Sequence, residues 1–407
     1  MNSNIVIIGG GHAAAQLCAG LAEAGQGARV HLVCEEAAVP YHRPPLSKAF
    51  LKNAEEPLQP HRAETWYAEA GITLHLGDAA LAIDRAARTV SLRSGQVLEW
   101  ERLVLATGTR ARRLPALAGL SNVALLRAAD EAAQLRTLLA ATRHVTVLGG
   151  GFIGLEVAAS ALALGKQVQV LESAPRLLSR AVSPELSAHV LATHRAAGMD
   201  IRLDVRVGAP QIDGARLVGL EIDGEPQAID LLLLGIGAVP ETALAEAAGL
   251  ECADGIVVDA YMQTSDETVL AVGDCTRFPD RRAAEALRLE SVQNANDQAR
   301  TAVATLTGAP RPHDAVPWFW SEQGALRLQM AGLVPATGTT GAATVRRPGA
   351  NAASFSLLHY VDGQLRCVES VNAPVDHMMS RKLLEAGRSP DPAVAADPAV
   401  PLKTHLG

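Results

Sequence analysis

Short hydrophobic runs alternate with glycine-rich turns along most of the chain. Two of these runs, residues 5–8 and 145–148, are rich in β-branched side chains, and each leads into three glycines and then into a segment that favours a helix. Further strand-like runs, GITLHL, RTVSLR and RLVLATG, precede the second copy, and DLLLLGIG and TVLAVGDCTRF follow it. Strands that alternate with helices are typical of a parallel sheet. The pattern therefore predicts an α/β protein that contains the same strand–glycine–helix unit twice.

The position of the second unit indicates that one Rossmann-like domain is inserted into another. We assign residues 1–108 and 238–315 to the first domain and residues 109–237 to the insert. Residues 316–407 are expected to form a separate C-terminal α+β domain.

Within this C-terminal region, SFSLLHY and QLRCVES flank Asp362-Gly363, a pattern typical of a β-hairpin. A helix is expected near residues 375–386. The proline-rich tail SPDPAVAADPAVPL is expected to be extended and docked rather than regular.

Both glycine loops have the spacing of a dinucleotide-binding fingerprint. The first glycine makes a tight turn, the second allows the backbone to approach a pyrophosphate, and the third position is small so that helix and strand pack closely. Free N–H groups at the start of the helix then favour the anion. The positions are Gly9, Gly11 and Ala14 in the first loop and Gly149, Gly151 and Gly154 in the second.

Each unit also ends its next strand with an acid, Glu35 in RVHLVCEE and Glu172 in QVQVLES. These acids lie 24 and 21 residues after Gly11 and Gly151. A carboxylate at this place accepts hydrogen bonds from a ribose 2′-OH and repels a 2′-phosphate. The two complete sets favour two bound dinucleotides over the alternative of glycine turns that are only structural.

A pair of adenine dinucleotides is useful when one passes a hydride to the other, so we expect FAD and NADH. Glu172 favours NADH over NADPH, although Arg176 and Arg180 lie close behind it and a basic residue there could accept a 2′-phosphate. Ligands of open α/β sheets lie beyond the carboxyl ends of the strands. The residues expected at such ends are Thr107, Gly108, Gly235, Gly237 and Asp274.

Composition restricts the class of protein further. The net charge of −7 and the pI near 6.0 argue against a nucleic-acid or anionic-membrane partner, which needs a basic face. No apolar run reaches the roughly 20 residues that cross a bilayer, and the start resembles no signal peptide, so a cytoplasmic location is expected. The five cysteines are scattered without a CxxC motif or a His/Cys cluster, so neither a disulfide framework nor a metal site is expected.

Taken in order, eight motifs resemble those of a known family. They are IIGGGHA, PYHRPPLSKAFL, LVLATG, VLGGGFIGLE, LLLLGIG, YMQTSDETVLAVGDCTRF, ESVQNA and PWFWSEQG, and they span nearly the whole chain. The chain resembles the FAD-dependent, NADH-linked ferredoxin reductases that supply Rieske-type dioxygenases and bacterial cytochromes P450. The resemblance implies a glutathione-reductase-like arrangement of the two dinucleotide domains. Two residues depart from the pattern: His42 stands where an acid is common, and His12 replaces a small apolar residue.

The resemblance also implies roles for single residues. The expected FAD contacts are Gly9, Gly11 and Ala14 at the pyrophosphate, Glu35 at the ribose, Arg43 at the phosphates, Lys48 near the isoalloxazine, Ala80 on the adenine side, Arg127 at the hinge, Asp274 at the ribityl chain and Val292 near the ring. The expected NADH contacts are Gly149, Gly151, Gly154, Glu172 and Arg180, with Glu156 paired to Lys48 at the nicotinamide. Trp320 is expected to lie against the flavin.

Each of these roles has a structural alternative. Lys48 could be an exposed lysine before a helix, and Glu156 could lie in a first helical turn because the helix dipole favours an acid there. Asp274 could be a helix N-cap, and the aromatic run at residues 318–320 could be core packing. Related disulfide reductases keep a redox cysteine pair where residues 39–51 have none, and Cys34 is expected to be packed rather than reactive.

These features favour a flavoprotein that takes a hydride from NADH and delivers single electrons to a [2Fe–2S] ferredoxin, which in turn serves a terminal oxygenase. The ferredoxin is expected to dock near Arg281, Arg282 and Arg288, although a solvated helix face would also explain this cluster. Two other functions stay open. One is an NADH oxidase or quinone-type reductase, and the other is an NADH-sensing interaction protein that resembles apoptosis-inducing factor.

Overall fold

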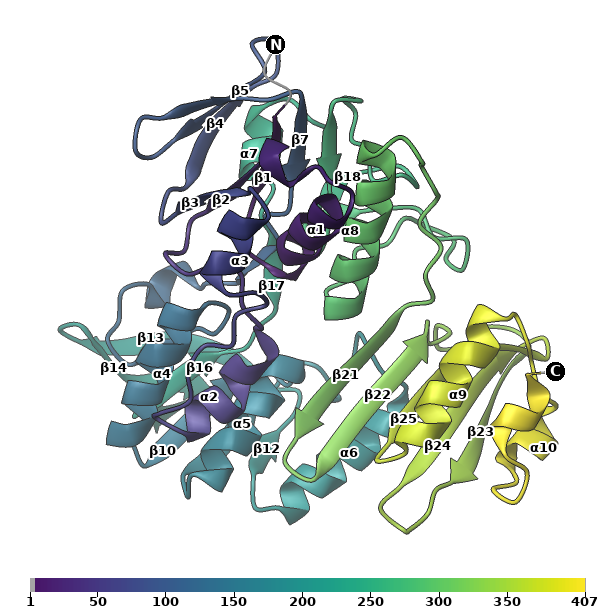
Figure 1. Ribbon diagram of the computed structural model, residues 1–407. Helices are drawn as coiled ribbons and strands as arrows, with labels where there is room; N and C mark the ends of the chain where they lie inside the picture. The colour runs from purple at the N-terminus through teal and green to yellow at the C-terminus, as the bar shows by residue number, and fades with distance from the viewer. Residues whose placement is uncertain (1–3, 407) are drawn as a thin grey trace. The chain divides into compact units, whose positions relative to one another are not determined.

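The computed structural model describes residues 4–406, which form two compact units (Figure 1). The first unit consists of residues 4–42, 58–110 and 239–315. The second unit consists of residues 43–57, 111–238 and 316–406. The chain thus enters the second unit three times, and the short excursion at residues 43–57 was missed by the sequence-based division.

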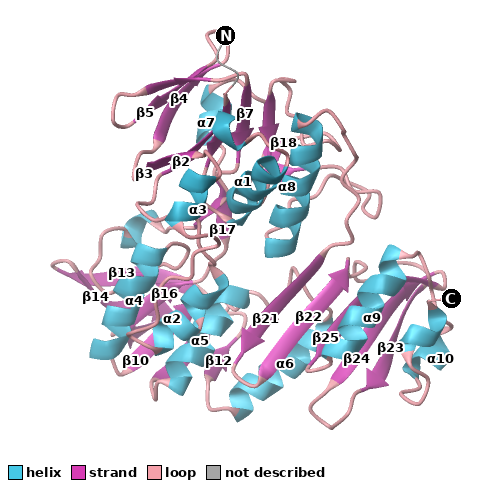
Figure 2. Ribbon diagram, in the orientation of Figure 1, coloured by secondary structure: helices cyan, strands magenta, loops and turns pink. Residues whose placement is uncertain are grey.

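The first unit is built on a five-stranded parallel sheet with strand order β3-β2-β1-β7-β19. All four residues of β1 are buried, as expected for the central strand of a sheet that is covered on both faces. Two helices of this unit, α1 and α8, pack side by side (Figures 1 and 2). The elements are β1 (Ile5–Ile8), β2 (Val30–Cys34), β3 (Thr73–Leu76), β7 (Arg102–Leu105), β19 (Val269–Ala271), α1 (His12–Glu23) and α8 (Val292–Leu306).

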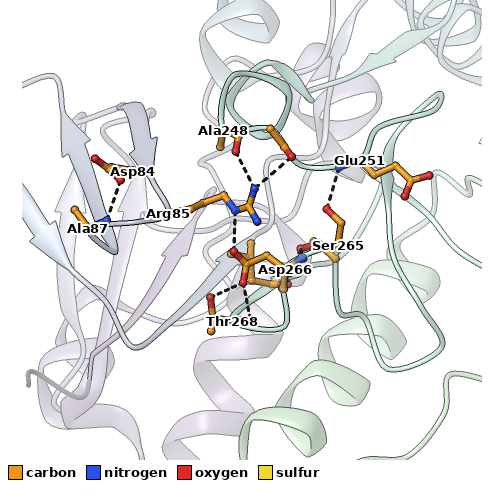
Figure 3. A network of polar contacts seen from close by, with 11 residues as sticks. Asp84, Arg85, Ala87, Ala248, Glu251, Ser265, Asp266 and Thr268 are labelled. Atoms are coloured by element: carbon orange, nitrogen blue, oxygen red, sulfur yellow. Dashed lines mark hydrogen bonds and ion pairs between the residues drawn. The ribbon is translucent and has the colours of Figure 1, made fainter.

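An antiparallel meander is attached to this unit by a polar network (Figure 3). The Nε atom of Arg85 lies 2.7 Å from Oδ2 of Asp266, and the same guanidinium donates to the carbonyls of Ala248 and Gly249. Burial alone would raise the pKa of Asp266, but hydrogen bonds from Thr268 and from Arg85 hold that pKa below its usual value. The meander consists of β4 (Ala80–Asp84), β5 (Thr89–Leu92) and β6 (Val97–Glu99). The first unit also contains η1 (Gly27–Arg29), α3 (Glu64–Glu69), α7 (Ala243–Ala247), β18 (Ile256–Val257) and β20 (Thr276–Arg277).

The second unit repeats the same plan. Its parallel sheet has the order β12-β11-β10-β16-β9, so β10 pairs with β11 and β16 as β1 pairs with β2 and β7. The elements of the insert are η3 (Pro115–Leu117), β9 (Val123–Ala124), α4 (Ala129–Ala141), β10 (His144–Leu148), α5 (Phe152–Ala163), β11 (Gln167–Leu171), α6 (Pro184–Ala196), β12 (Asp200–Arg202), β13 (Val207–Asp213), β14 (Arg216–Ile222), β15 (Glu225–Ala228) and β16 (Leu231–Leu234). The short strands β8 (Thr109–Ala111) and β17 (Ala238–Pro240) lie where the chain passes from one unit to the other. The excursion adds η2 (Pro44–Ser47) and α2 (Ala49–Lys52). This duplication agrees with the α/β fold that the sequence predicts.

The C-terminal part of the second unit is an antiparallel sheet of order β21-β22-β25-β24-β23 that packs against α9. The predicted hairpin is confirmed, because Asp362 and Gly363 both have positive φ, +49° and +74°, as the tight turn between two twisted strands requires. The predicted helix is also present. The elements are β21 (Trp318–Gln323), β22 (Leu326–Gly332), β23 (Ala342–Pro348), β24 (Phe355–Val361), β25 (Gln364–Val371) and α9 (Pro374–Glu385).

The proline-rich tail is docked, but the expectation that it is irregular is wrong. It forms the short helix α10 (Pro392–Ala396) and a 3₁₀ turn, η4 (Leu402–His405). Asp391 caps α10 by accepting hydrogen bonds from two backbone N–H groups, and Pro392 occupies the first helical position, which needs no N–H donor. The buried guanidinium of Arg347 donates to the carbonyls of Ala395, Asp397 and Val400 and so fixes the tail.

Among residues 4–406, no helix is long and apolar enough to cross a membrane.

The C-terminal sheet carries a histidine that predicts how stability depends on pH. His377 of α9 is only 4% exposed, and burial, together with Arg381 and Arg327, lowers the pKa of His377 to about 4. The unfolded chain, in which a histidine titrates near pH 6.5, binds this proton more readily than the folded chain. The free energy of unfolding therefore falls as the pH drops from about 6.5 towards 4.

We expect the variant His377→Gln, which cannot titrate, to lose less stability over this pH range than the native chain. Urea denaturation at pH 7.5, 6.0 and 5.0 measures the difference in unfolding free energy between the two proteins. A difference that stays constant with pH would show that His377 does not contribute in this way.

Candidate functional site

Both loops begin with a glycine that no other residue could replace. Gly9 has φ +124°, and a Cβ atom on it would lie 2.1 Å from the carbonyl oxygen of Ala106. Gly149 has φ +108°, and its Cβ atom would lie 2.3 Å from the carbonyl oxygen of Gly235. Steric exclusion by the neighbouring strand end therefore fixes both turns.

The second glycine of each loop is free of such conflict. A Cβ atom on Gly11 would meet nothing within 4 Å, and one on Gly151 would meet only an oxygen at 3.9 Å. The fold itself thus leaves open space there, next to the first residue of α1 or α5. This space fits a pyrophosphate that approaches the backbone, as in FAD and NADH.

The third position of each loop lies where the helix packs closely against the strand. A Cβ atom on Gly154 would lie 2.4 Å from the carbonyl oxygen of Gly149, and Ala14 is fully buried. The first and third positions of each loop therefore have the steric constraints that the spacing predicts, and contact of the second position with a pyrophosphate stays a prediction.

The two acids differ in their surroundings. Glu172 Oε2 accepts a hydrogen bond of 2.6 Å from Gly150 N, and its Oε1 accepts one of 2.7 Å from Ala174 N, so this carboxylate is fixed beside the second loop. Arg176 donates to two backbone carbonyls of its own loop, whereas Arg180 is exposed beside Gly237. Glu35 is exposed and forms an ion pair of 3.1 Å with Arg93.

The remaining predicted FAD contacts either follow strands of the parallel sheet or begin other elements. Thr107 and Gly108 follow β7, Ala80 begins β4, and Val292 is the first residue of α8. Asp274 follows β19 and precedes β20, so the interpretation of Asp274 as a helix N-cap is wrong.

Half-buried Lys48 and buried Glu156, which the sequence places 108 residues apart, form an ion pair in the second unit. The carboxylate of Glu156 is 4% exposed and accepts hydrogen bonds from Lys48 Nζ at 2.8 Å, Ser47 Oγ at 2.5 Å and Ser321 Oγ at 2.7 Å. Glu156 is the fifth residue of α5, so the interpretation that it serves the first helical turn is wrong. A buried carboxylate needs such donors, because an unpaired charge in the interior is costly.

The segment before Lys48 is held to α5 by a second contact. Ser160, one turn beyond Glu156, donates a hydrogen bond of 2.7 Å to the carbonyl of Ser47. Arg43 donates through Nη1 to the carbonyl of Arg127 at 2.9 Å. The excursion that carries Arg43 and Lys48 is thus fixed at both of these residues within the second unit.

Strand β21 divides its side chains between two faces. Phe319 packs on Phe152 of α5, with ring centroids 4.6 Å apart, and Ser321 reaches Glu156 of the same helix. Trp318 and Trp320, which alternate with them, are 5.6 Å apart and point to the opposite face. The three predicted catalytic residues therefore do not form one cluster, because Trp320 faces away from Glu156.

The polar face of β21 continues beyond Ser321. Gln323 Nε2 donates to Ser321 Oγ at 3.1 Å, and Gln323 Oε1 lies 2.9 Å from Nε2 of His194 on α6. Burial lowers the pKa of His194, and the hydrogen bond to Gln323 offsets part of this effect. Sequence reasoning missed Ser47 and Ser321, although both lie inside motifs that carry the resemblance.

Thiol chemistry finds no support in the structure. All five cysteines are free, and four of them, including Cys34, are buried. Burial raises the pKa of Cys18, Cys275 and Cys367, and it raises the pKa of the half-buried Cys252 to about 11. Thiols with a raised pKa are poor nucleophiles at neutral pH.

The predicted arginine cluster is neutralised by acids. Arg281 lies 2.6 Å from Asp314, and Arg282 bonds to both Asp314 and Asp280. Arg288 pairs with Glu290 and Asp254 and is 15% exposed in its side chain. Within the described chain, residues 279–290 contain no helix, so the alternative of a solvated helix face is wrong. Docking of a ferredoxin at these arginines stays a prediction.

A group that the sequence did not predict consists of His12, His42 and His61. One ring nitrogen of each lies within 4.8 Å of the others, although the residues are separated along the chain. The two departures from the family pattern, His12 and His42, are both members of this group.

Two family models match the chain. Residues 3–299 match the pyridine nucleotide-disulphide oxidoreductase family, and residues 318–406 match the reductase C-terminal family. Rhodocoxin reductase of Rhodococcus erythropolis is 41% identical over 99% of this chain and 94% of its own length. Terpredoxin reductase of a Pseudomonas species is 39% identical over 98% of this chain and 97% of its own length.

The chain is also similar in fold to reductases of known structure. The ferredoxin reductase for the CYP199A2 system of Rhodopseudomonas palustris has a TM-score of 0.94 and 42% identity, and the match covers 100% of both chains. The reductase of the covalent putidaredoxin reductase–putidaredoxin complex has a TM-score of 0.92 and 37% identity, over 100% of this chain and 98% of that one.

The buried ion pair can be tested by a double-mutant cycle. We expect Lys48→Met to lower the free energy of unfolding by roughly 1–3 kcal/mol, because Glu156 keeps only its two serine donors. Adding Glu156→Gln to this variant should restore part of the loss, because the carboxamide carries no charge. Urea denaturation of the two single variants and the double variant measures the coupling.

Lys52→Met, at an exposed lysine four residues further on, is the matched control and should leave stability nearly unchanged. If the effects of Lys48→Met and Glu156→Gln on the free energy of unfolding simply add in the double variant, Lys48 is not coupled to Glu156.

Proposed function

The chain belongs to the pyridine nucleotide-disulphide oxidoreductase family, and we propose that it uses FAD and NADH to deliver single electrons to a [2Fe–2S] ferredoxin. Full-length similarity to proteins named rhodocoxin, terpredoxin and putidaredoxin reductase supports this acceptor. The relatives also include the ferredoxin–NAD(+) reductase component of an anthranilate 1,2-dioxygenase system from Burkholderia cepacia. The ferredoxin would then serve a Rieske-type oxygenase or a cytochrome P450.

The observation that carries the proposal is the pair of glycine loops with open space at Gly11 and Gly151. Two dinucleotide sites in one chain suit a reaction in which one nucleotide reduces the other. FAD, when bound, supplies the chemistry that the side chains lack, because it takes up two electrons together and releases them singly. The side chains then need only to bind, orient and exclude water, so catalysis rests mainly on positioning.

Individual residues have defined tasks in this proposal. Gly9, Gly11 and Ala14 hold FAD, with Glu35, Arg43, Ala80, Thr107, Gly108, Arg127, Asp274 and Val292 as further contacts. Gly149, Gly151 and Gly154 hold NADH, with Glu172, Arg180, Gly235 and Gly237. Glu156 fixes the position of the Lys48 ammonium, which stabilises negative charge on the cofactor. Trp320 provides an aromatic face that excludes water from its own side of β21.

The fixed carboxylate of Glu172 supports NADH over NADPH. Its two backbone hydrogen bonds hold a negative charge where a 2′-phosphate would lie, and Arg176 is engaged with its own loop. Only Arg180 is exposed in this loop as a cation for NADPH.

The lack of a cysteine pair in residues 39–51 distinguishes this chain from disulfide reductases. Residues 39–51 contain no cysteine, and the half-buried thiol, that of Cys252, has a raised pKa. A bound FAD would therefore find no cysteine pair in this segment to take up its electrons. A cytoplasmic location stays a prediction.

We expect NADH to drive rapid cytochrome c reduction only when a [2Fe–2S] ferredoxin is added to the purified FAD-loaded protein, and NADPH to be a poorer donor. The rate of cytochrome c reduction, measured with and without ferredoxin and with NADH or NADPH at equal protein concentration, tests both expectations. Equal rates with and without every ferredoxin tried, despite a flavin that NADH bleaches, would favour the NADH oxidase or the sensor instead.

Docking of the ferredoxin at Arg281, Arg282 and Arg288 is the finer part of the proposal. Arg281 is the most exposed of the three, with 68% of its side chain accessible, so it is the one that can meet a partner. We expect Arg281→Glu to slow ferredoxin-dependent cytochrome c reduction severalfold, and to leave ferricyanide reduction unchanged, because it repels an acidic partner.

Arg300→Glu is the matched control, because Arg300 is also exposed and also paired with an aspartate. If both variants reduce cytochrome c at the native rate, the docking surface lies elsewhere.

A further inference from the structure

Three imidazoles from distant parts of the chain meet in the first unit. His12, His42 and His61 each place one ring nitrogen within 4.8 Å of the nitrogens of the other two. The ring centroids of His42 and His61 are 3.9 Å apart, and those of His12 and His61 are 4.6 Å apart. Such close approach of three basic rings, with no role in the proposed electron transfer, calls for a ligand that they share.

The backbone holds these three residues in place. Tyr41 and Pro60 form an antiparallel bridge, His42 N donates to the carbonyl of Gln59 at 2.8 Å, and His61 N donates to the carbonyl of Pro40 at 2.9 Å. His12 is the first residue of α1, directly after the sterically fixed glycine turn. The three Cα positions are therefore fixed by secondary structure, and only side-chain rotation remains.

The donor set selects the kind of ligand. Imidazole nitrogen suits zinc, nickel and copper ions, whereas magnesium and calcium prefer oxygen. Three protein ligands with one open position is a common arrangement for zinc, with Zn–N distances of about 2.0–2.1 Å. His12 is buried, His61 is half-buried and His42 is exposed, so the group has a protein side and an open side through which an ion can enter.

We propose that His12, His42 and His61 form a binding site for a divalent transition-metal ion of the zinc class. The ion binds three neutral imidazoles and keeps one position open to water. The site does not depend on the proposed function, because all three ligands belong to the first unit and none of them is assigned to a cofactor.

The position of the site gives it a structural consequence. The chain leaves the first unit after His42, passes through the excursion that carries Arg43 and Lys48, and returns at residue 58, three residues before His61. A metal ion held by His42 and His61 therefore links the residues at which the excursion begins and ends. His12 links both of them to the first glycine loop.

Calorimetric titration of the FAD-loaded protein with zinc chloride, after treatment with EDTA and dialysis, tests the proposal. We expect one zinc ion per chain, and a Kd that rises roughly tenfold or more in His42→Gln and in His61→Gln. The control His144→Gln removes an exposed histidine of the second unit and should keep the native Kd. The FAD content of each variant shows that it has folded.

A second measurement on the unaltered protein does not depend on the variants. Electron paramagnetic resonance of one equivalent of bound Cu²⁺ should show coupling to three imidazole nitrogens. A native Kd in both His42→Gln and His61→Gln, the absence of saturable zinc binding, or a copper spectrum with fewer than three nitrogens would each overturn the proposal.

Discussion

A single buried carboxylate, that of Glu156, holds distant segments of the second unit together. Removing a charge from water is costly unless hydrogen-bond donors replace the water, so this side chain requires partners wherever the chain can supply them. Its donors come from the excursion, through Ser47 and Lys48, and from β21, through Ser321. Two segments that are far apart in the sequence are thereby brought to one helix, α5.

Features with a local physical cause could be predicted from the sequence. The glycine turns are fixed by steric exclusion between adjacent strand ends, and the hairpin at Asp362-Gly363 is fixed by two residues of positive φ. The central strands could also be predicted, because apolar runs bounded by glycine are a local signal of a buried strand. The cap of α10 was equally local, since Asp391 and Pro392 are the usual residues at a helix start, and here the proline-rich composition was given too much weight.

Features that depend on distant partners could not be predicted in this way. Nothing in PPLSK indicates that it leaves the first unit, because the cause is an acid 108 residues away. The arginines at 281, 282 and 288 suggested a basic patch, but their charges are balanced by acids such as Asp254 and Asp314, which lie outside that stretch. Local counts of cations therefore overestimate the charge of a surface.

The alternation of side chains along β21 places polar groups on one face of the strand and tryptophan rings on the other. On one face, hydroxyl, carboxamide and imidazole groups form a chain of hydrogen bonds from Glu156 to His194. On the other face, Trp318 and Trp320 place two aromatic rings next to each other. Because side chains alternate strictly along a strand, a register slip of one residue would exchange the two faces at once. The register of β21 on β22 thus decides which residues join the hydrogen-bonded chain and which present aromatic rings, so a single pairing keeps polar and aromatic side chains apart.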